Sequence, residues 1–176
     1  MSSDAELIQL LRQGDRQAFA DVYKRHKTAV YRYCFRMLAN TDAAEDATHD
    51  TFMKMFQNIS SLQKTDAFLP WLFHIARNEV FMYLRRNKRN ETHNNETVWD
   101  ESTPHEILVS TETTELVQKT LLNLKSEYRE VVLLREYGQL SYAQIAEITG
   151  DTESSVKSRL FKARKALTKK LKKYYS

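Results

Sequence analysis

Residues 141–164, SYAQIAEITGDTESSVKSRLFKAR, constrain the fold more than any other segment of the chain. The segment places a small residue at Ala146, a glycine at Gly150 and an apolar residue at Val156. A small side chain lets two helices cross closely, and glycine readily adopts the left-handed backbone of a tight turn. The spacing therefore predicts a helix-turn-helix. The alternative is a plain helical hairpin, because short motifs also match by chance.

The second helix of this motif is predicted to have one apolar and one polar side. Val156 and Leu160 are expected to face the first helix. The residues left on the outer side are short hydroxyls and cations: Ser154, Ser155, Lys157, Ser158, Arg159 and Lys162. Such side chains suit a helix that lies in the major groove of DNA. We therefore expect these six residues to contact duplex DNA.

The composition favours an all-α protein. The chain has only three Gly and two Pro, which leaves few residues suited to tight turns. No apolar run approaches the ~20 residues of a membrane span, and the acidic start lacks the basic region of a signal peptide. Cys34 is the single cysteine, and the five His have no metal-ligand spacing. We expect a cytoplasmic protein without membrane insertion, metal or cofactor.

The charges are concentrated in three blocks although the net charge is only +4. Residues 152–176 hold nine Lys or Arg against one acid, and residues 77–89 hold five against one. Between them, residues 90–115 hold seven acids and no Lys or Arg. Two basic blocks around an acidic one predict two nucleic-acid contact surfaces joined by a spacer, whereas either basic block alone would fit an ordinary solvated face.

The first ninety residues are predicted to form helices with buried apolar stripes. Asp15 is expected to cap a helix whose stripe includes Cys34, which we interpret as a small core residue and not as a nucleophile. Asp42 and Glu45 resemble a capping box at the start of a second helix. That helix has an apolar side of Phe52, Met55, Phe56 and Ile59 and an acidic side of Asp42, Glu45, Asp46, His49 and Asp50.

A polar loop, residues 60–66, precedes a third predicted helix over residues 66–89. Arg77, Phe81, Arg85 and Lys88 recur on one face of it at helical spacing. Cations that alternate with an aromatic side chain suit binding to a phosphate backbone beside an unstacked base. This face fits equally well an ordinary solvated helix surface with one exposed Phe.

The remaining chain divides into a linker and a second helical domain. Residues 90–110 have no sustained periodicity, so we expect an acidic flexible linker between domains at 1–89 and 111–176. Trp99 is unusual in such a segment and could dock on a partner or on the chain itself. A helical stretch over 112–137 is expected to break near Asn123, with Ser126 capping its second part and Gly138 ending it.

The order of these segments resembles the extracytoplasmic-function sigma factors of bacterial RNA polymerase. Residues 42–52, DAAEDATHDTF, are similar to the acidic AED-x-x-Q-E-x-F segment of that family. Residues 68–86, which include FLPWL, IARN and LRR, are similar to its F-x-x-W-L-x-x-I-A-R-N…L-R-R helix. Residues 140–164 match its promoter-reading hairpin. Three motifs in this order are far more specific than any one of them.

The resemblance implies a function and assigns residues to it. The chain would be an alternative sigma factor that binds core RNA polymerase, directs promoter recognition and transcription initiation, and is commonly held by an anti-sigma protein. Polymerase contact is implied for Asp42, Glu45, Asp46, His49, Asp50 and Phe52. Contact with the melted downstream promoter element is implied for Ser60, Ser61, Lys64, Arg77, Asn78, Arg85 and Arg86. Contact with the upstream promoter element, as duplex DNA, is implied for Ser154, Ser155, Lys157, Ser158, Arg159 and Lys162.

The chain departs from the family pattern at a few positions, and other functions stay open. His49 stands where Gln is usual, Met82 where Asp is common, and Gln144 where Glu is usual. A helix-turn-helix activator or repressor that does not replace sigma is the main alternative. A nucleic-acid enzyme such as a small recombinase would need an activated nucleophile or a metal-binding carboxylate cluster. Asp46 and Asp50 lack a third convergent ligand, so we expect no enzyme.

Overall fold

A computed structural model describes residues 2–91 and 112–175, and every regular element in these ranges is helical. The helices are α1 (Asp4–Arg12), α2 (Arg16–Leu38), α3 (Thr41–Asn58), α4 (Phe68–Glu91), α5 (Glu112–Leu122), α6 (Ser126–Glu136), α7 (Tyr142–Thr149) and α8 (Glu153–Tyr175). The predicted loop at 60–66 instead contains parts of two short 3₁₀ helices, η1 (Ile59–Ser61) and η2 (Thr65–Ala67). The expected all-α fold is confirmed.

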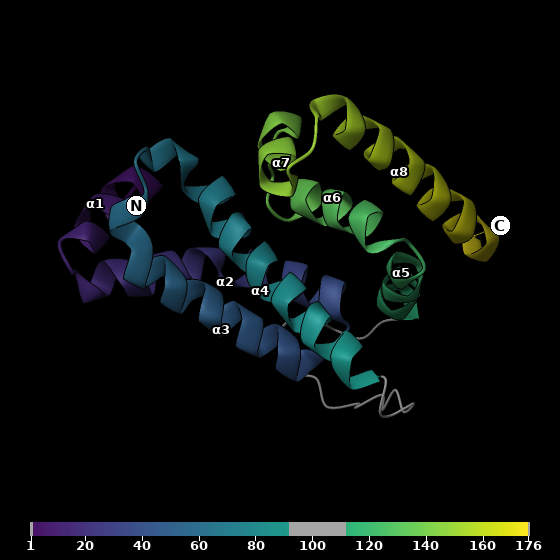
Figure 1. Ribbon diagram of the computed structural model, residues 1–176, viewed down its shortest axis with the longest axis horizontal. Helices are drawn as coiled ribbons and strands as arrows, with labels where there is room; N and C mark the ends of the chain where they lie inside the picture. Colours follow the sequence, from purple (N-terminus) through teal and green to yellow (C-terminus); the bar gives the residue numbers. More distant parts are fainter. Residues whose placement is uncertain (1, 92–111, 176) are drawn as a thin grey trace.

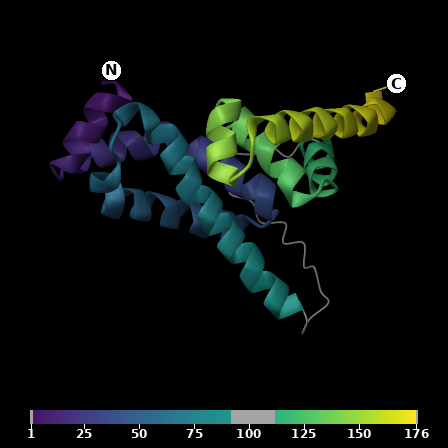
Figure 2. The ribbon, with the colours of Figure 1, turned by 45° about the horizontal axis from the view of Figure 1, so that its top comes forward.

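The helices form two domains. Helices α1 to α4 pack together on one side of the molecule, and α5 to α8 pack on the other, with α8 along the outer edge (Figure 1). The view in Figure 2 shows α4 running obliquely under the second domain. The predicted linker, 90–110, lies outside the described residues apart from its first two positions, which end α4.

The core of the first domain is formed around α2, as its apolar periodicity predicts. Cys34 is fully buried on this helix, and burial raises the pKa of its thiol to about 12, so it stays protonated at neutral pH. Tyr33 is also fully buried and packs edge-on against Phe73 of α4, with ring centroids 5.8 Å apart. Cys34 is therefore a core residue without nucleophilic character.

Two helix starts differ from the sequence prediction. Helix α3 is capped by Asn40, whose side chain accepts a hydrogen bond from the Ala43 N–H at 2.8 Å, so the predicted capping box of Asp42 and Glu45 is wrong. Asn40 lies in extended backbone before the helix, as a capping residue must. Ser126 is the first residue inside α6, and the preceding residue makes no side-chain cap.

The helix-turn-helix is present in the second domain. Gly150 ends α7 with φ 70°, the left-handed conformation that the turn requires. Val156 and Leu160, which were expected to face the first helix, are buried, as are Ile145 and Ile148 of α7. Before α7, Gly138 is also required, because an added Cβ would lie 2.7 Å from the Leu134 carbonyl oxygen.

The two domains contact each other directly. Helix α2 contacts α5 and α6, and α4 contacts α7. Arg36 of α2 donates a hydrogen bond to Gln118 Oε1 of α5 at 2.9 Å, with both residues buried. A single buried apolar cluster includes residues from both domains. Among residues 2–91 and 112–175, no helix has the length and apolar character that crossing a membrane requires.

Candidate nucleic-acid interface

Helix α3 buries one face and presents an acidic face to solvent. Ala44, Ala47 and Thr51 are buried, which brings α3 close to its neighbours and leaves the other side in solvent. The exposed residues recur at steps of three and four: Asp42, Glu45, Asp46, His49 and Asp50. They therefore lie in one row along the helix, where their charges add into a negative surface.

Phe52 does not reach this acidic surface. Its side chain is 1% exposed, and its ring packs edge-on against Tyr23 of α2 at 4.8 Å between centroids. Phe56, one turn later, is 40% exposed and packs on Phe19 at 5.4 Å. Phe52 thus supports α3 from inside the domain, and Phe56 is the aromatic side chain of α3 that solvent reaches.

A hollow of about 250 Å³ lies between the end of α3 and the first half of α4. Its lining includes Ser61 and Asn78, two of the residues expected to contact unpaired DNA, together with Asn58 and Trp71. Lys54 and the buried carboxylate of Glu79 also line it and form an ion pair across the two helices. The hollow therefore combines an aromatic ring, two side-chain amides and a hydroxyl.

The other residues expected to contact the downstream promoter element differ in their exposure to solvent. Ser60 and Lys64 are exposed in the segment between α3 and α4, and Arg85 and Arg86 are exposed in the second half of α4. Arg77 differs from them. Its guanidinium stacks on the Phe81 ring at 4.7 Å and its Nε donates to Glu130 of α6, so its side chain is only 24% exposed.

The start of α8 is capped by a side chain of the preceding turn. The Thr152 hydroxyl accepts a hydrogen bond from the Ser155 N–H at 3.1 Å, which caps the helix. Five of the six residues expected to contact DNA extend from this helix at positions that solvent reaches freely or partly: Ser154, Ser155, Lys157, Ser158 and Lys162. The sixth, Arg159, forms an ion pair with Asp151 of the turn. That pair fixes the direction of its planar guanidinium.

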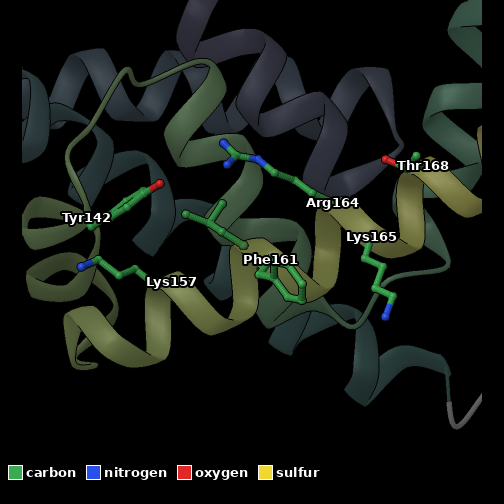
Figure 3. Close-up of a pocket in the computed structure, with 7 residues that line it drawn as sticks. Tyr142, Lys157, Phe161, Arg164, Lys165 and Thr168 are labelled. Atoms are coloured by element: carbon green, nitrogen blue, oxygen red, sulfur yellow. The ribbon is translucent and has the colours of Figure 1, made fainter.

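An exposed aromatic side chain on α8 was missed by the sequence analysis. Phe161 is 69% exposed, and Figure 3 shows it between Lys157 and Lys165 on the outer face of the helix. The Lys157 ammonium lies 5.9 Å from the ring centroid of Tyr142, which belongs to α7. These residues, with Arg164, line a shallow groove of about 350 Å³. The signal was available, because Phe161 lies outside the apolar stripe of α8.

Comparison with known proteins matches both domains to one family. Residues 22–90 match the family model for Sigma-70 region 2, and residues 114–167 match that for Sigma-70, region 4. The ECF RNA polymerase sigma factor SigW of Bacillus subtilis is 32% identical over 177 residues, covering 94% of this chain and 95% of that protein. The chain belongs to the sigma-70 family, as an extracytoplasmic-function sigma factor.

Further relatives agree with this assignment. The ECF RNA polymerase sigma-E factor of Escherichia coli is 29% identical over 181 residues, covering 96% of this chain and 94% of that protein. The solved sigma factor RpoE of Bartonella quintana, in complex with the anti-sigma factor NepR, superposes with a TM-score of 0.73 at 26% identity. That match covers 88% of this sigma factor and 96% of the solved chain.

Apart from Phe52, which is buried, and Arg77, which is held by Glu130, the predicted residues of this sigma factor lie on three surfaces. They are the acidic row of α3, the hollow between α3 and α4 with the nearby cations, and the outer face of α8. Within the described residues there is no group of three or more His, Cys, Asp or Glu placed to hold a metal ion. Glu130, which binds Arg77 across the domain boundary, was not foreseen. Its one signal in the sequence is an acid directly before the apolar run of residues 131–134.

Proposed function

We propose that this sigma factor binds core RNA polymerase through the acidic row of α3 and reads promoter DNA through α8 and the hollow between α3 and α4. The observation that carries the proposal is the family match over both domains together with the exposure of these three surfaces. The chain itself would perform no catalytic step. Its action would be to place the polymerase at a promoter and to hold the separated strands, in the cytoplasm.

The polymerase contact follows from the charge of the α3 row. Asp46 and Asp50 are one helical turn apart and both are exposed, so a basic helical surface of the polymerase could pair with both at once. Asp42, Glu45 and His49 would extend the contact along the helix. Phe52 would contribute indirectly, because its buried ring holds α3 on α2. The domain formed by residues 1–89 would thus carry the main polymerase contact.

The promoter contacts would be of two kinds. On duplex DNA, the hydroxyls and cations of α8 would enter the major groove, and we add Phe161 to them as an apolar contact for a thymine methyl group. On separated strands, one unpaired base would enter the hollow, stack on Trp71 and bond to Asn58, Ser61 or Asn78. Ser60, Lys64, Arg77, Arg85 and Arg86 would hold the flanking phosphates. Residues 90–110 would connect the two contacts.

An anti-sigma protein is a further proposed partner. The support is the structure of the sigma factor RpoE of Bartonella quintana, which was solved with the anti-sigma factor NepR. We extend to this chain only the class of partner.

The test of the proposed function separates it from a repressor or activator that acts without replacing sigma. Labelled chain is titrated with bacterial core RNA polymerase without DNA, and with duplex promoter DNA without polymerase. A sigma factor is expected to bind the core polymerase tightly in the first titration. Absence of polymerase binding together with tight, sequence-specific binding of the free chain to duplex DNA would favour the activator or repressor.

We expect Trp71→Ala to weaken binding of polymerase holoenzyme to pre-melted promoter DNA by about 1–3 kcal/mol, because one base loses its stacking surface. Binding of the chain to upstream duplex DNA should not change. Trp71→Phe keeps an aromatic surface and is the matched control, which should retain most of the affinity. Equal binding by wild type and the Ala variant, measured by fluorescence anisotropy, would remove the hollow from the promoter contact.

We expect Phe161→Ala to weaken binding to the cognate upstream element by about 1–2 kcal/mol, since the ring would lose apolar burial against a base. The protein should keep its melting temperature because the ring is exposed. Tyr174→Ala is a matched control, because Tyr174 is 68% exposed on the same helix but lies beyond the helix-turn-helix. A loss of similar size in both variants, or in neither, would contradict a role for Phe161.

A further inference from the structure

The two domains meet at an ion pair that uses a proposed DNA-binding residue. Arg77 Nε of α4 donates to Glu130 Oε1 of α6, and the two residues are 53 positions apart in the chain. Glu130 is 3% exposed, so its carboxylate is enclosed by the domain contact. The guanidinium of Arg77 is covered on one face by the Phe81 ring. The guanidinium of Arg77 is therefore held by the protein at Nε and on one face, and its side chain is only partly exposed.

The surroundings of Glu130 connect both proposed DNA contacts. Burial raises the pKa of Glu130, and the hydrogen bond and charge of Arg77 oppose that rise. The charge of Arg159 in α8 also lowers the pKa of Glu130. The charge of Asp151, which forms an ion pair with Arg159, raises it. Tyr33 of α2 and Arg129 of α6 are also within electrostatic range of one another at this contact. One buried carboxylate thus accepts from Arg77 and is within electrostatic range of Arg159, and both arginines are proposed to bind DNA.

A second pair of residues, Arg36 of α2 and Gln118 of α5, forms hydrogen bonds across the same domain contact. Arg36 Nη1 donates to Gln118 Oε1 at 2.9 Å, and Gln118 Nε2 donates to the Arg36 carbonyl at 3.4 Å. Neither residue belongs to a proposed polymerase or DNA surface. This pair therefore offers a way to weaken the domain contact without changing Arg77 or Glu130.

We propose that Glu130 acts as an internal substitute for DNA phosphate, which holds Arg77 and keeps the free chain closed. A carboxylate and a phosphate both accept from the guanidinium of arginine, and they compete for the same N–H groups. DNA phosphate can therefore take the Nε–H of Arg77 only when Glu130 is displaced. This inference rests on the proposed function only in taking Arg77 as a phosphate contact, and it adds an autoinhibitory contact to that function.

The experiment measures binding of the full chain to a random-sequence single-stranded oligonucleotide over a range of salt concentrations. Each phosphate contact on a single strand changes the slope of log K against log salt by about 0.7, which corresponds to about fivefold in affinity near 0.1 M salt. Glu130→Ala is expected to bind about fivefold more tightly than wild type, with a slope steeper by about 0.7. Small-angle X-ray scattering should show a larger radius of gyration for the same variant.

Two matched variants separate release of Arg77 from a simple change of net charge. Glu127→Ala removes the same charge from an exposed position one turn earlier on α6, and should give neither the gain in affinity nor the expansion. In the double variant Glu130→Ala with Arg77→Ala, the gain should disappear. Three results would overturn the proposal. They are an equal gain in oligonucleotide affinity in Glu127→Ala, a gain in affinity that persists in the double variant, and no gain in affinity in Glu130→Ala.

A third variant decides the question if Glu130→Ala fails to melt cooperatively. Gln118→Ala changes no charge and leaves α6 intact, yet it should also expand the chain and tighten binding to the oligonucleotide. Unchanged affinity in that variant would overturn the proposal. Transcription with core polymerase, measured in parallel on wild type, reports on the proposed function separately, because it does not depend on whether the free chain is closed.

Discussion

Replacing Asp46 and Asp50 together by alanine is expected to lower the affinity for core RNA polymerase by about a thousandfold, about 4 kcal/mol. Both carboxylates are exposed on one face of α3, and a polymerase surface that pairs with them would be left with unpaired cations at the interface. The helix should stay folded, because neither side chain contributes to the core. Titration of labelled chain with core polymerase measures the loss.

The control for this variant removes the same charge elsewhere. Glu127 and Glu147 are exposed carboxylates of the second domain, and the double change of these two residues to alanine should leave polymerase affinity within about twofold. Duplex DNA binding should be unchanged in the α3 variant. Wild-type affinity for polymerase after loss of Asp46 and Asp50 would remove α3 from the proposed interface.

Arg159→Ala is expected to reduce discrimination between promoter sequences by about 1–3 kcal/mol, at one base pair of the upstream element. The ion pair with Asp151 fixes the guanidinium in one direction, which suits the bidentate contact that arginine makes with guanine. The measurement compares affinities of the variant and wild type for a set of duplexes, each altered at one position.

Lys162→Ala provides the contrast on the same helix. Lys162 is exposed and carries a compact charge on a flexible chain, so it is expected to contact phosphate. Its removal should weaken binding to all duplexes about equally and reduce the salt slope by about 0.9. The same uniform loss in Arg159→Ala would reassign Arg159 to the DNA backbone.

The features that sequence predicted well are those that depend on local periodicity. The helix-turn-helix follows from Gly150, which needs a left-handed backbone, and from the buried stripe at Val156 and Leu160. The acidic row of α3 follows from steps of three and four residues. Both depend only on which side of a helix each residue occupies, and that is set by 3.6 residues per turn.

Helix boundaries, and contacts between residues distant in the sequence, were harder to predict from the sequence. The cap of α3 went to Asn40 because two nearby polar residues could each cap the helix, and the chain path before it decides between them. Helix α1 was not predicted, although Ser3 and Glu6 form a capping box at its start. The Arg77–Glu130 pair joins residues 53 positions apart and depends on how two domains pack, which no local pattern records.

The most direct test of the central claim is in vitro transcription with bacterial core RNA polymerase on a pool of the host's promoter DNA, with and without this protein. A sigma factor is expected to produce discrete transcripts that require it, and the Asp46, Asp50 double variant should produce none. The opposite result would be no transcript from the wild-type protein while it binds duplex DNA specifically without polymerase. That outcome would contradict a sigma factor and would support a regulator that binds DNA alone.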